Sequence, residues 1–185
     1  MVLLRKEREG VMEHLNFIKV LSIEHEEIAR DVEALQGRVE RVLQQTQDQV
    51  LTFTSSEQEL NEMVELVHYL HGKIHSHFYK EEQALFQVME ESLSDRKCTT
   101  LMREEHREIL ERCFGLLSLL HDWKDHLLDP EKVSKLQHLL LEVVNSFRSH
   151  IRREEQVLYP MAQICLRDEQ REEIERRVKD IKLMA

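Results

Sequence analysis

HFYKEEQALF, residues 77–86, and HIRREEQVLY, residues 150–159, share one pattern: a histidine, a Glu-Glu-Gln run four residues later and a final Leu-aromatic pair after one variable residue. Two shorter segments, Glu24–Ile28 and Glu105–Ile109, share the pattern Glu-His-x-Glu-Ile. The longer segments lie 73 residues apart and the shorter ones 81, so the two copies differ mainly in loop length. A repeated helix pair of this kind predicts a bundle with a pseudo-two-fold axis.

Composition and charge narrow the fold class and the partners. The chain has 185 residues with 4 Gly and 2 Pro, too few turn formers for many short strands, and its charged fraction of 34% suits long amphipathic helices. The net charge of −10 argues against a nucleic acid or an anionic membrane as partner. The apolar runs are too short to span a membrane, and early charges argue against a signal peptide. Three cysteines without a CxxC motif fit a reducing cytoplasm, so we expect a cytoplasmic protein.

Hydrophobic periodicity divides the chain into helices. We expect four long helices and a shorter amphipathic one, at about residues 11–45, 55–91, 101–126, 130–166 and 168–184. Short loops between long helices favour antiparallel neighbours. The predicted fold is therefore all-α, an up-down antiparallel four-helix bundle with a short additional C-terminal helix. The corresponding regions are an N-terminal arm, the bundle and the C-terminal helix, at residues 1–10, 11–166 and 167–185.

Capping signals indicate the expected helix boundaries. Ser55–Glu59 reads as a capping box that starts the second helix, and Thr99 or Thr100 is the expected cap of the third. Asp129–Glu131 places a capping Asp before a Pro at the first helical position. Pro160 predicts a kink or a local break within the fourth helix.

The histidines, 11 in number, are the compositional excess that needs an explanation. His77 and Glu81, like His150 and Glu154, stand four residues apart and so share one helix face. One further histidine on each of the other two long helices lies among apolar residues that should face inward. Burying two carboxylates without a cation would cost several kcal/mol each, so we predict a metal site. Its ligands would be two sets of two imidazoles and one carboxylate, which suit non-haem iron: His25, His77, Glu81, His106, His150 and Glu154.

At these residues the sequence resembles the hemerythrin-like, or HHE cation-binding, family over about residues 11–166. The family has a His on the first helix, His-x-x-x-Glu on the second, a His on the third and a His followed by a carboxylate on the fourth. The resemblance implies two iron ions in an oxo- or hydroxo-bridged di-iron centre, with Glu81 and Glu154 as bridging carboxylates. It also implies binding of O2, or of a related small molecule such as NO or peroxide.

The third helix departs from the oxygen-carrying hemerythrins. Those proteins have a second histidine one turn after the first, where this chain has Leu110. On the fourth helix the carriers place the carboxylate five residues after the histidine, whereas Glu154 follows His150 by four. Fewer protein ligands leave more open coordination positions, which favours reaction with O2 or peroxide over stable oxygen carriage. We therefore favour a sensor of O2, iron or redox state, which would signal through a second subunit or a separate protein partner.

Two other classes of function remain as alternatives. A di-iron enzyme with peroxidase or oxidase-type activity is the first, although the ferritin-like fold needs two Glu-x-x-His motifs and only Glu65–His68 fits. A metal-free helical interaction module is the second, and it leaves the inward His-Glu pairs unexplained.

Several further polar residues have two interpretations each. Glu24 and Glu105 precede predicted ligands and would either hydrogen-bond free imidazole nitrogens or lie on a solvated face. The stripe His68, His71 and His75 points away from His77 and is either a surface metal chelate or a solvated or interface face. Cys113 is either a redox partner of the metal site or a buried core thiol. His14 lies too far along its helix to share the metals.

Overall fold

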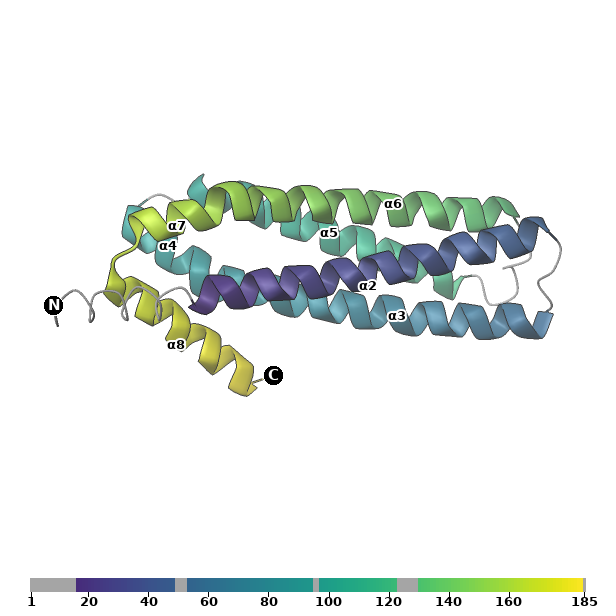
Figure 1. The fold of residues 1–185 in the computed structure, drawn as a ribbon, viewed down its shortest axis with the longest axis horizontal. Coiled ribbons are helices and arrows are strands. Elements are labelled where there is room, and N and C mark those ends of the chain that lie inside the picture. The colour runs from purple at the N-terminus through teal and green to yellow at the C-terminus, as the bar shows by residue number, and fades with distance from the viewer. Residues whose placement is uncertain (1–15, 49–52, 95–96, 123–129, 185) are drawn as a thin grey trace, which may run out of the picture. The chain divides into compact units, whose positions relative to one another are not determined.

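The computed structural model describes residues 16–48, 53–94, 97–122 and 130–184. Within these ranges the chain is almost entirely helical and contains no strand, which confirms the predicted all-α fold. The described residues form four long helices, α2 (Asn16–Gln47), α3 (Phe53–Lys80), α5 (Lys97–His121) and α6 (Pro130–Arg153) (Figure 1). They also form three shorter ones, α4 (Gln87–Leu93), α7 (Tyr159–Cys165) and α8 (Asp168–Met184). No helix in the described part of the chain is both long and apolar enough to cross a membrane.

Two π-helical segments interrupt the long helices. The segment η1 (Glu81–Phe86) joins α3 to α4, and η2 (Glu154–Leu158) joins α6 to α7. Each begins at the glutamate of a His-x-x-x-Glu motif. Such π-helical turns are rare and concentrate at functional sites, and neither was predicted from the pattern of residues.

The chain divides into two compact units. Unit 1 comprises Met1–Glu26, Ser76–Glu104 and Ile151–Ala185, and unit 2 comprises Glu27–His75 and Glu105–His150. The four long helices each run from one unit into the other. Along the sequence, every crossing point lies within two residues of one of the four predicted histidine ligands.

In unit 2, ion pairs join α2 to α3 at two levels. Arg38 on α2 pairs with Glu59 and Glu62 on α3, with Arg38 Nη1 3.0 Å from Glu59 Oε2. Lys73 Nζ on α3 lies 2.7 Å from Asp31 Oδ2 on α2. Because residue numbers rise along α2 where they fall along α3, the two helices are antiparallel, as predicted.

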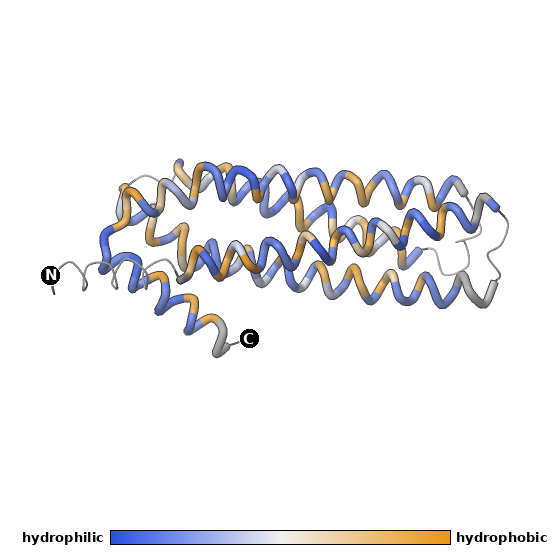
Figure 2. Tube along the Cα trace, viewed as in Figure 1, coloured by the Kyte–Doolittle hydropathy of each residue, from blue (hydrophilic) through white to orange (hydrophobic). Residues whose placement is uncertain are grey.

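Other side-chain contacts join the remaining neighbouring helices of unit 2. An ion pair between Arg148 and Glu33 joins α6 to α2, and the rings of His68 and His121 are in contact between α3 and α5. The Nε2 atoms of His106 and His150 meet between α5 and α6. The four segments therefore close into a ring in the order α2, α3, α5, α6. Their buried residues recur at helical spacing, on α2 at Ile28, Val32, Leu35, Val39 and Val42. Figure 2 shows the same alternation of hydrophobic and hydrophilic residues along each helix.

Unit 1 has its own hydrophobic core, to which α8 contributes. The core draws buried residues from α2, η1, α4, α5, η2, α7 and α8, among them Leu21, Leu85, Phe86, Met89, Met102, Leu158, Ala162 and Ile174. Ile174 and Val178, the residues expected on the apolar side of the last helix, are buried here. Arg177 Nη1 also donates to Gln87 Oε1 at 2.9 Å. The C-terminal helix thus packs through the face that its periodicity predicted.

Some predicted boundaries were wrong. Helix α3 begins at Phe53, two residues before the expected capping box, and α5 begins at Lys97, so that Thr99 and Thr100 lie inside it. Thr99 is buried, and its hydroxyl donates to the Glu90 carboxylate on α4 instead of capping a helix. An acceptor on a neighbouring helix therefore replaces the local backbone partner that a cap would have used.

The fourth helix is continuous through its proline. Pro130 is the first residue of α6, as predicted, and the expected break at Pro160 does not occur. The irregularity is instead the π-helical turn of η2 just before Pro160. The matching turn η1 forms without a following proline, so Pro160 is not required for such a turn. The N-terminal arm, the start of the first helix, His14 and Asp129 lie outside the described residues.

Candidate metal centre

Unit 1 brings four of the six predicted ligands together. His25 comes from α2, His77 from the last turn of α3, and Glu81 and Glu154 from the first positions of η1 and η2. None is more than 2% exposed, and one ligand atom of each lies within 4.8 Å of the others. His25 Nε2 is 3.1 Å from Glu154 Oε2, and His77 Nε2 is 3.6 Å from Glu81 Oε2. Two imidazoles and two carboxylates therefore converge in a buried place.

The outer nitrogens of these imidazoles face carboxylates. Nδ1 of His77 lies 2.9 Å from Oε2 of Glu24, and Nδ1 of His25 lies 3.3 Å from Oε1 of Glu155. A proton held at Nδ1 and donated to a carboxylate leaves the Nε2 lone pair directed toward the cluster. Glu24 also accepts a hydrogen bond from the buried Lys80.

The carboxyl group of Glu24 is held in its ionised form. Burial alone would raise its pKa, but hydrogen bonds from His77 and Lys80 and the charges of these two residues outweigh burial and lower the pKa to about 2. Glu24 is therefore an anionic acceptor that fixes the tautomer and the orientation of the His77 ring.

His25 responds to the two buried carboxylates. Burial alone would lower its pKa, but the hydrogen bond to Glu154 and the negative charges of Glu81 and Glu154 raise the pKa above its ordinary value. A cation is thus favoured at this place, because the carboxylates attract a proton when nothing else neutralises them.

Tyr159 belongs to the cluster, although the ligand pattern in the sequence did not identify it. Its hydroxyl donates to Glu81 Oε1 at 2.6 Å and lies 3.4 Å from His25 Nε2, and its ring stacks on that of His25 at a centroid distance of 5.8 Å. Burial and the charges of Glu81 and Glu154 raise the pKa of Tyr159 well above its ordinary value, so the phenol keeps its proton. The signal that could have found it is the aromatic position that ends the longer repeat.

In unit 2 the other two predicted histidines form a pair. His106 on α5 and His150 on α6 are at most 1% exposed, and their Nε2 atoms lie 3.1 Å apart. Nδ1 of His150 is 3.0 Å from Oε2 of Glu105. Two imidazole nitrogens that face each other at this distance can share one proton or point at one cation.

The structure decides between the interpretations of Glu24 and Glu105. Both carboxylates hydrogen-bond imidazole nitrogens, which favours the first interpretation over a solvated face. Each binds a histidine on the next helix of its repeat, Glu24 binding His77 and Glu105 binding His150. Glu82, which corresponds to Glu155 in the repeat, instead forms an ion pair with Arg103, with Arg103 Nη1 3.1 Å from Glu82 Oε2.

The remaining candidates lie apart from the cluster. His68 and His75 are exposed and His71 is half-buried, and no potential metal group among the described residues includes them. Cys113 is 2% exposed, and burial raises its pKa to about 12. A thiol that resists ionisation to this degree is unreactive, which supports the core-thiol interpretation. Leu110 is half-buried, unlike His106 one turn before it.

The donor set of unit 1 fits a metal cation. His77 Nε2 is a buried nitrogen without a hydrogen-bond partner among the described residues, although it lies beside Glu81. Neutral imidazoles and ionised carboxylates are the ligands that iron and related divalent ions accept in proteins. Without a cation, two buried carboxylates at this distance would repel each other and lose their solvation. His25, His77, Glu81 and Glu154 could thus hold a metal ion within one compact unit.

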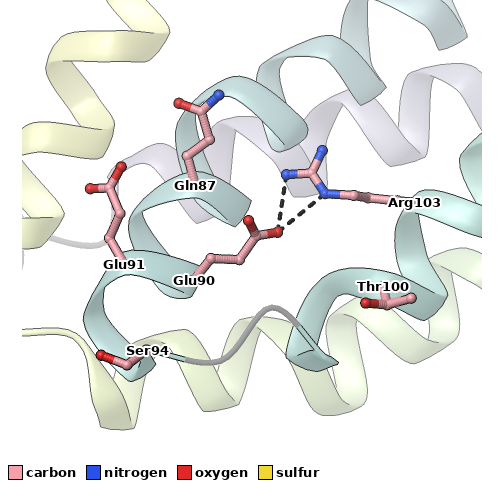
Figure 3. Close-up of a pocket in the computed structure, with 6 residues that line it drawn as sticks. All are labelled: Gln87, Glu90, Glu91, Ser94, Thr100 and Arg103. Carbon is pink, nitrogen blue, oxygen red and sulfur yellow. Dashed lines mark hydrogen bonds and ion pairs between the residues drawn. The ribbon is translucent and has the colours of Figure 1, made fainter.

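A separate cavity in unit 1 includes none of the predicted ligands. It has a volume of about 720 Å³ and is lined by Gln87, Glu90, Glu91, Ser94, Thr100 and Arg103 (Figure 3). The Arg103 guanidinium binds Glu90 in the view of Figure 3 and also Glu82, so its charge is already neutralised. We therefore assign no ligand to this cavity.

Comparison with protein families also indicates a cation-binding domain. The family model described as the hemerythrin HHE cation binding domain matches residues 16–162, and a second match spans residues 99–181, which include the second copy of the repeat. Neither the curated proteins nor the solved structures gave a significant match to the chain. Since the first match covers most of the chain and contains all six predicted ligands, the protein belongs to the hemerythrin HHE cation-binding domain family.

Proposed function

We propose that this protein holds two non-haem iron ions and binds or reacts with O2, NO or peroxide in the sensing of oxygen, iron or redox state. The observation that carries the proposal is the buried cluster of unit 1, where His25, His77, Glu81 and Glu154 place ligand atoms within 4.8 Å of one another. The outer nitrogens of both histidines face carboxylates, as metal-bound imidazoles usually do.

The second iron would use the histidine pair of unit 2. His106 and His150 already direct their Nε2 atoms toward each other, and Glu105 orients His150. Glu154 follows His150 by one helical turn along the chain, the same spacing that separates Glu81 from His77. In this proposal Glu81 and Glu154 would be the bridging carboxylates of an oxo- or hydroxo-bridged di-iron centre, as the family resemblance implies.

Iron is favoured over zinc by the ligand types. Structural zinc sites are usually tetrahedral and rich in cysteine, whereas no cysteine belongs to the cluster. Two imidazoles with carboxylates and open positions suit non-haem iron, which when bound would supply reversible electron transfer and exchangeable positions for a small ligand. The protein residues contribute the buried surroundings, the carboxylate charge and the orientation of each imidazole.

Anaerobic loading with Fe²⁺ tests the proposal. We expect about two iron ions per chain, as in other bundle-core di-iron sites, and an absorption spectrum that changes on exposure to O2. Loading should also raise the melting temperature, because an ion that binds only the folded chain stabilises it by about 4 kcal/mol at a free concentration a thousand times its dissociation constant. One zinc ion per chain, or no metal after loading, would contradict the proposal.

Peroxidase or oxidase-type activity is the second candidate. It rests on the difference from the oxygen-carrying hemerythrins on the third helix. Where those proteins have a further histidine, this chain has the half-buried Leu110. Catalytic turnover of hydrogen peroxide with a reducing substrate by the iron-loaded protein, absent from the metal-free protein, would support this candidate over sensing.

A further inference from the structure

The two copies of the longer repeat differ at their last residue. The first copy ends in Phe86 and the second in Tyr159, and both side chains are buried, at 0% and 3% exposure. The ring of Phe86 faces the Arg103 guanidinium at 5.3 Å, whereas the hydroxyl of Tyr159 reaches into the ligand cluster of unit 1. One oxygen atom therefore distinguishes otherwise matching positions.

The Tyr159 hydroxyl has a defined partner. It donates to Glu81 Oε1 at 2.6 Å, while Glu81 Oε2 lies 3.6 Å from His77 Nε2. The tyrosine ring is itself held by stacking on His25, with an interplanar angle of 7°. Because a glutamate side chain has several rotatable bonds and a buried tyrosine has few accessible rotamers, this hydrogen bond restricts the carboxylate far more than the ring.

We propose that Tyr159 is a positioning residue, whose hydroxyl fixes the Glu81 carboxylate so that the ligand set of His25 and His77 takes up the first metal ion. The proposal rests on the metal-binding function proposed above. Preorganised ligands bind more tightly because less freedom is lost on binding. The second ion would then bind more weakly, at the set that includes His106 and His150.

A cobalt titration of the full chain tests the inference. Co²⁺ has absorption bands that report coordination geometry, and in an anaerobic titration it stays in the divalent state. We expect the wild-type protein to bind two Co²⁺ ions in resolved steps. Tyr159→Phe should weaken the first step by about 10- to 100-fold, a typical effect of removing a residue that hydrogen-bonds a metal ligand, and should bring the two steps together. It should also shift the absorption bands of the first ion.

Matched variants provide the controls. Tyr69→Phe removes a hydroxyl from a 58% exposed tyrosine of unit 2 and should leave both steps unchanged. His25→Ala should abolish the tight step, and His106→Ala should preserve it. Since phenylalanine already occupies the matching buried position 86, we expect Tyr159→Phe to fold, which circular dichroism of the metal-free protein checks.

Three results would overturn the inference while the proposed function stands. The first is an unchanged titration and spectrum in Tyr159→Phe, which would make Tyr159 a core aromatic residue. The second is loss of the tight step in His106→Ala but not in His25→Ala. The third is a phenolate-to-iron charge-transfer band in the iron-loaded wild-type protein that disappears in Tyr159→Phe, because Tyr159 would then be a ligand. A wild-type chain that binds no metal would refute both proposals.

Discussion

The two histidine pairs of the repeat have nearly the same geometry in different surroundings. The rings of His25 and His77 in unit 1 have centroids 4.6 Å apart at 65°, and those of His106 and His150 in unit 2 are 4.7 Å apart at 76°. Nδ1 of His77 lies 2.9 Å from Glu24, and that of His150 lies 3.0 Å from Glu105. The repeat has therefore preserved both the imidazoles and the carboxylates that orient them.

The two copies of the repeat differ in the residues that surround the histidine ligands. His25 faces Glu155 and stacks on Tyr159, whereas the corresponding residues of the first copy, Glu82 and Phe86, contact Arg103. Helical spacing places the histidine and the glutamate of each His-x-x-x-Glu motif on one helix face in both copies. Residues beyond the ligands vary without changing that spacing. Two sets of the same ligand types can therefore differ in affinity, and the following changes test how far they do.

Replacing a bridging carboxylate should have the largest effect. We expect Glu81→Ala and Glu154→Ala each to lose both metal ions, because each carboxylate would serve both histidine pairs. Metal analysis after anaerobic loading measures this. Glu82→Ala is the matched control, since Glu82 binds Arg103 outside the cluster. Loss of a single ion in either variant would mean that the two ligand sets are independent.

Replacing one histidine should have a smaller effect than replacing a bridge. His77→Ala should lose or greatly weaken one ion, because an imidazole that ends one ligand set is removed. His75→Ala, two residues away on the exposed side of α3, should retain full metal content. Iron loss in His75→Ala with retention in His77→Ala would show that the wrong helix face had been assigned.

The carboxylates that orient the histidines should matter less again. Glu24→Gln and Glu105→Gln should each reduce metal affinity by about tenfold, because the amide holds the imidazole less firmly than a carboxylate. A Co²⁺ titration compares the two variants, with Glu104→Gln as a control at an exposed neighbour. Equal losses of Co²⁺ affinity would show that Glu24 and Glu105 have the same role in the two copies of the repeat. A loss in only one variant would show that their roles differ.

The smallest expected change concerns Leu110. A third-helix histidine at this position would add a ligand to the second set, so Leu110→His should slow oxidation of the iron-loaded protein by air. Stopped-flow absorption compares the rates. Leu110 is half-buried, so the new side chain must turn inward to act, and we expect a several-fold effect at most. Wild-type protein that resists oxidation by air for hours would show that its pocket protects the metals without a ligand at this position.

The sequence by itself determined the helices and the inward histidines. Periodicity located the end of α2, the helical stretches 53–93 and 130–165, and α8 to within a few residues, and Pro130 marked the start of α6. The i, i+4 spacing of His77 and Glu81 was enough to place both side chains on one face. These features are local, because one turn of a helix fixes which residues share a side.

Only the tertiary structure decided which residues support the cluster. Tyr159 and Glu81 are 78 residues apart, His25 and Glu155 are 130 apart, and His77 and Glu24 are 53 apart. Thr99 resembles a helix cap because the residues next to it in sequence fit a helix start. The sequence does not show that the Glu90 carboxylate on the adjacent helix will accept its hydrogen bond. The π-helical turns at Glu81 and Glu154 were also hidden, since they depend on the packing of a whole helix and not on the preferences of its residues. Contacts between distant segments are set by how the helices pack, and the spacing of residues along one helix carries no record of that packing.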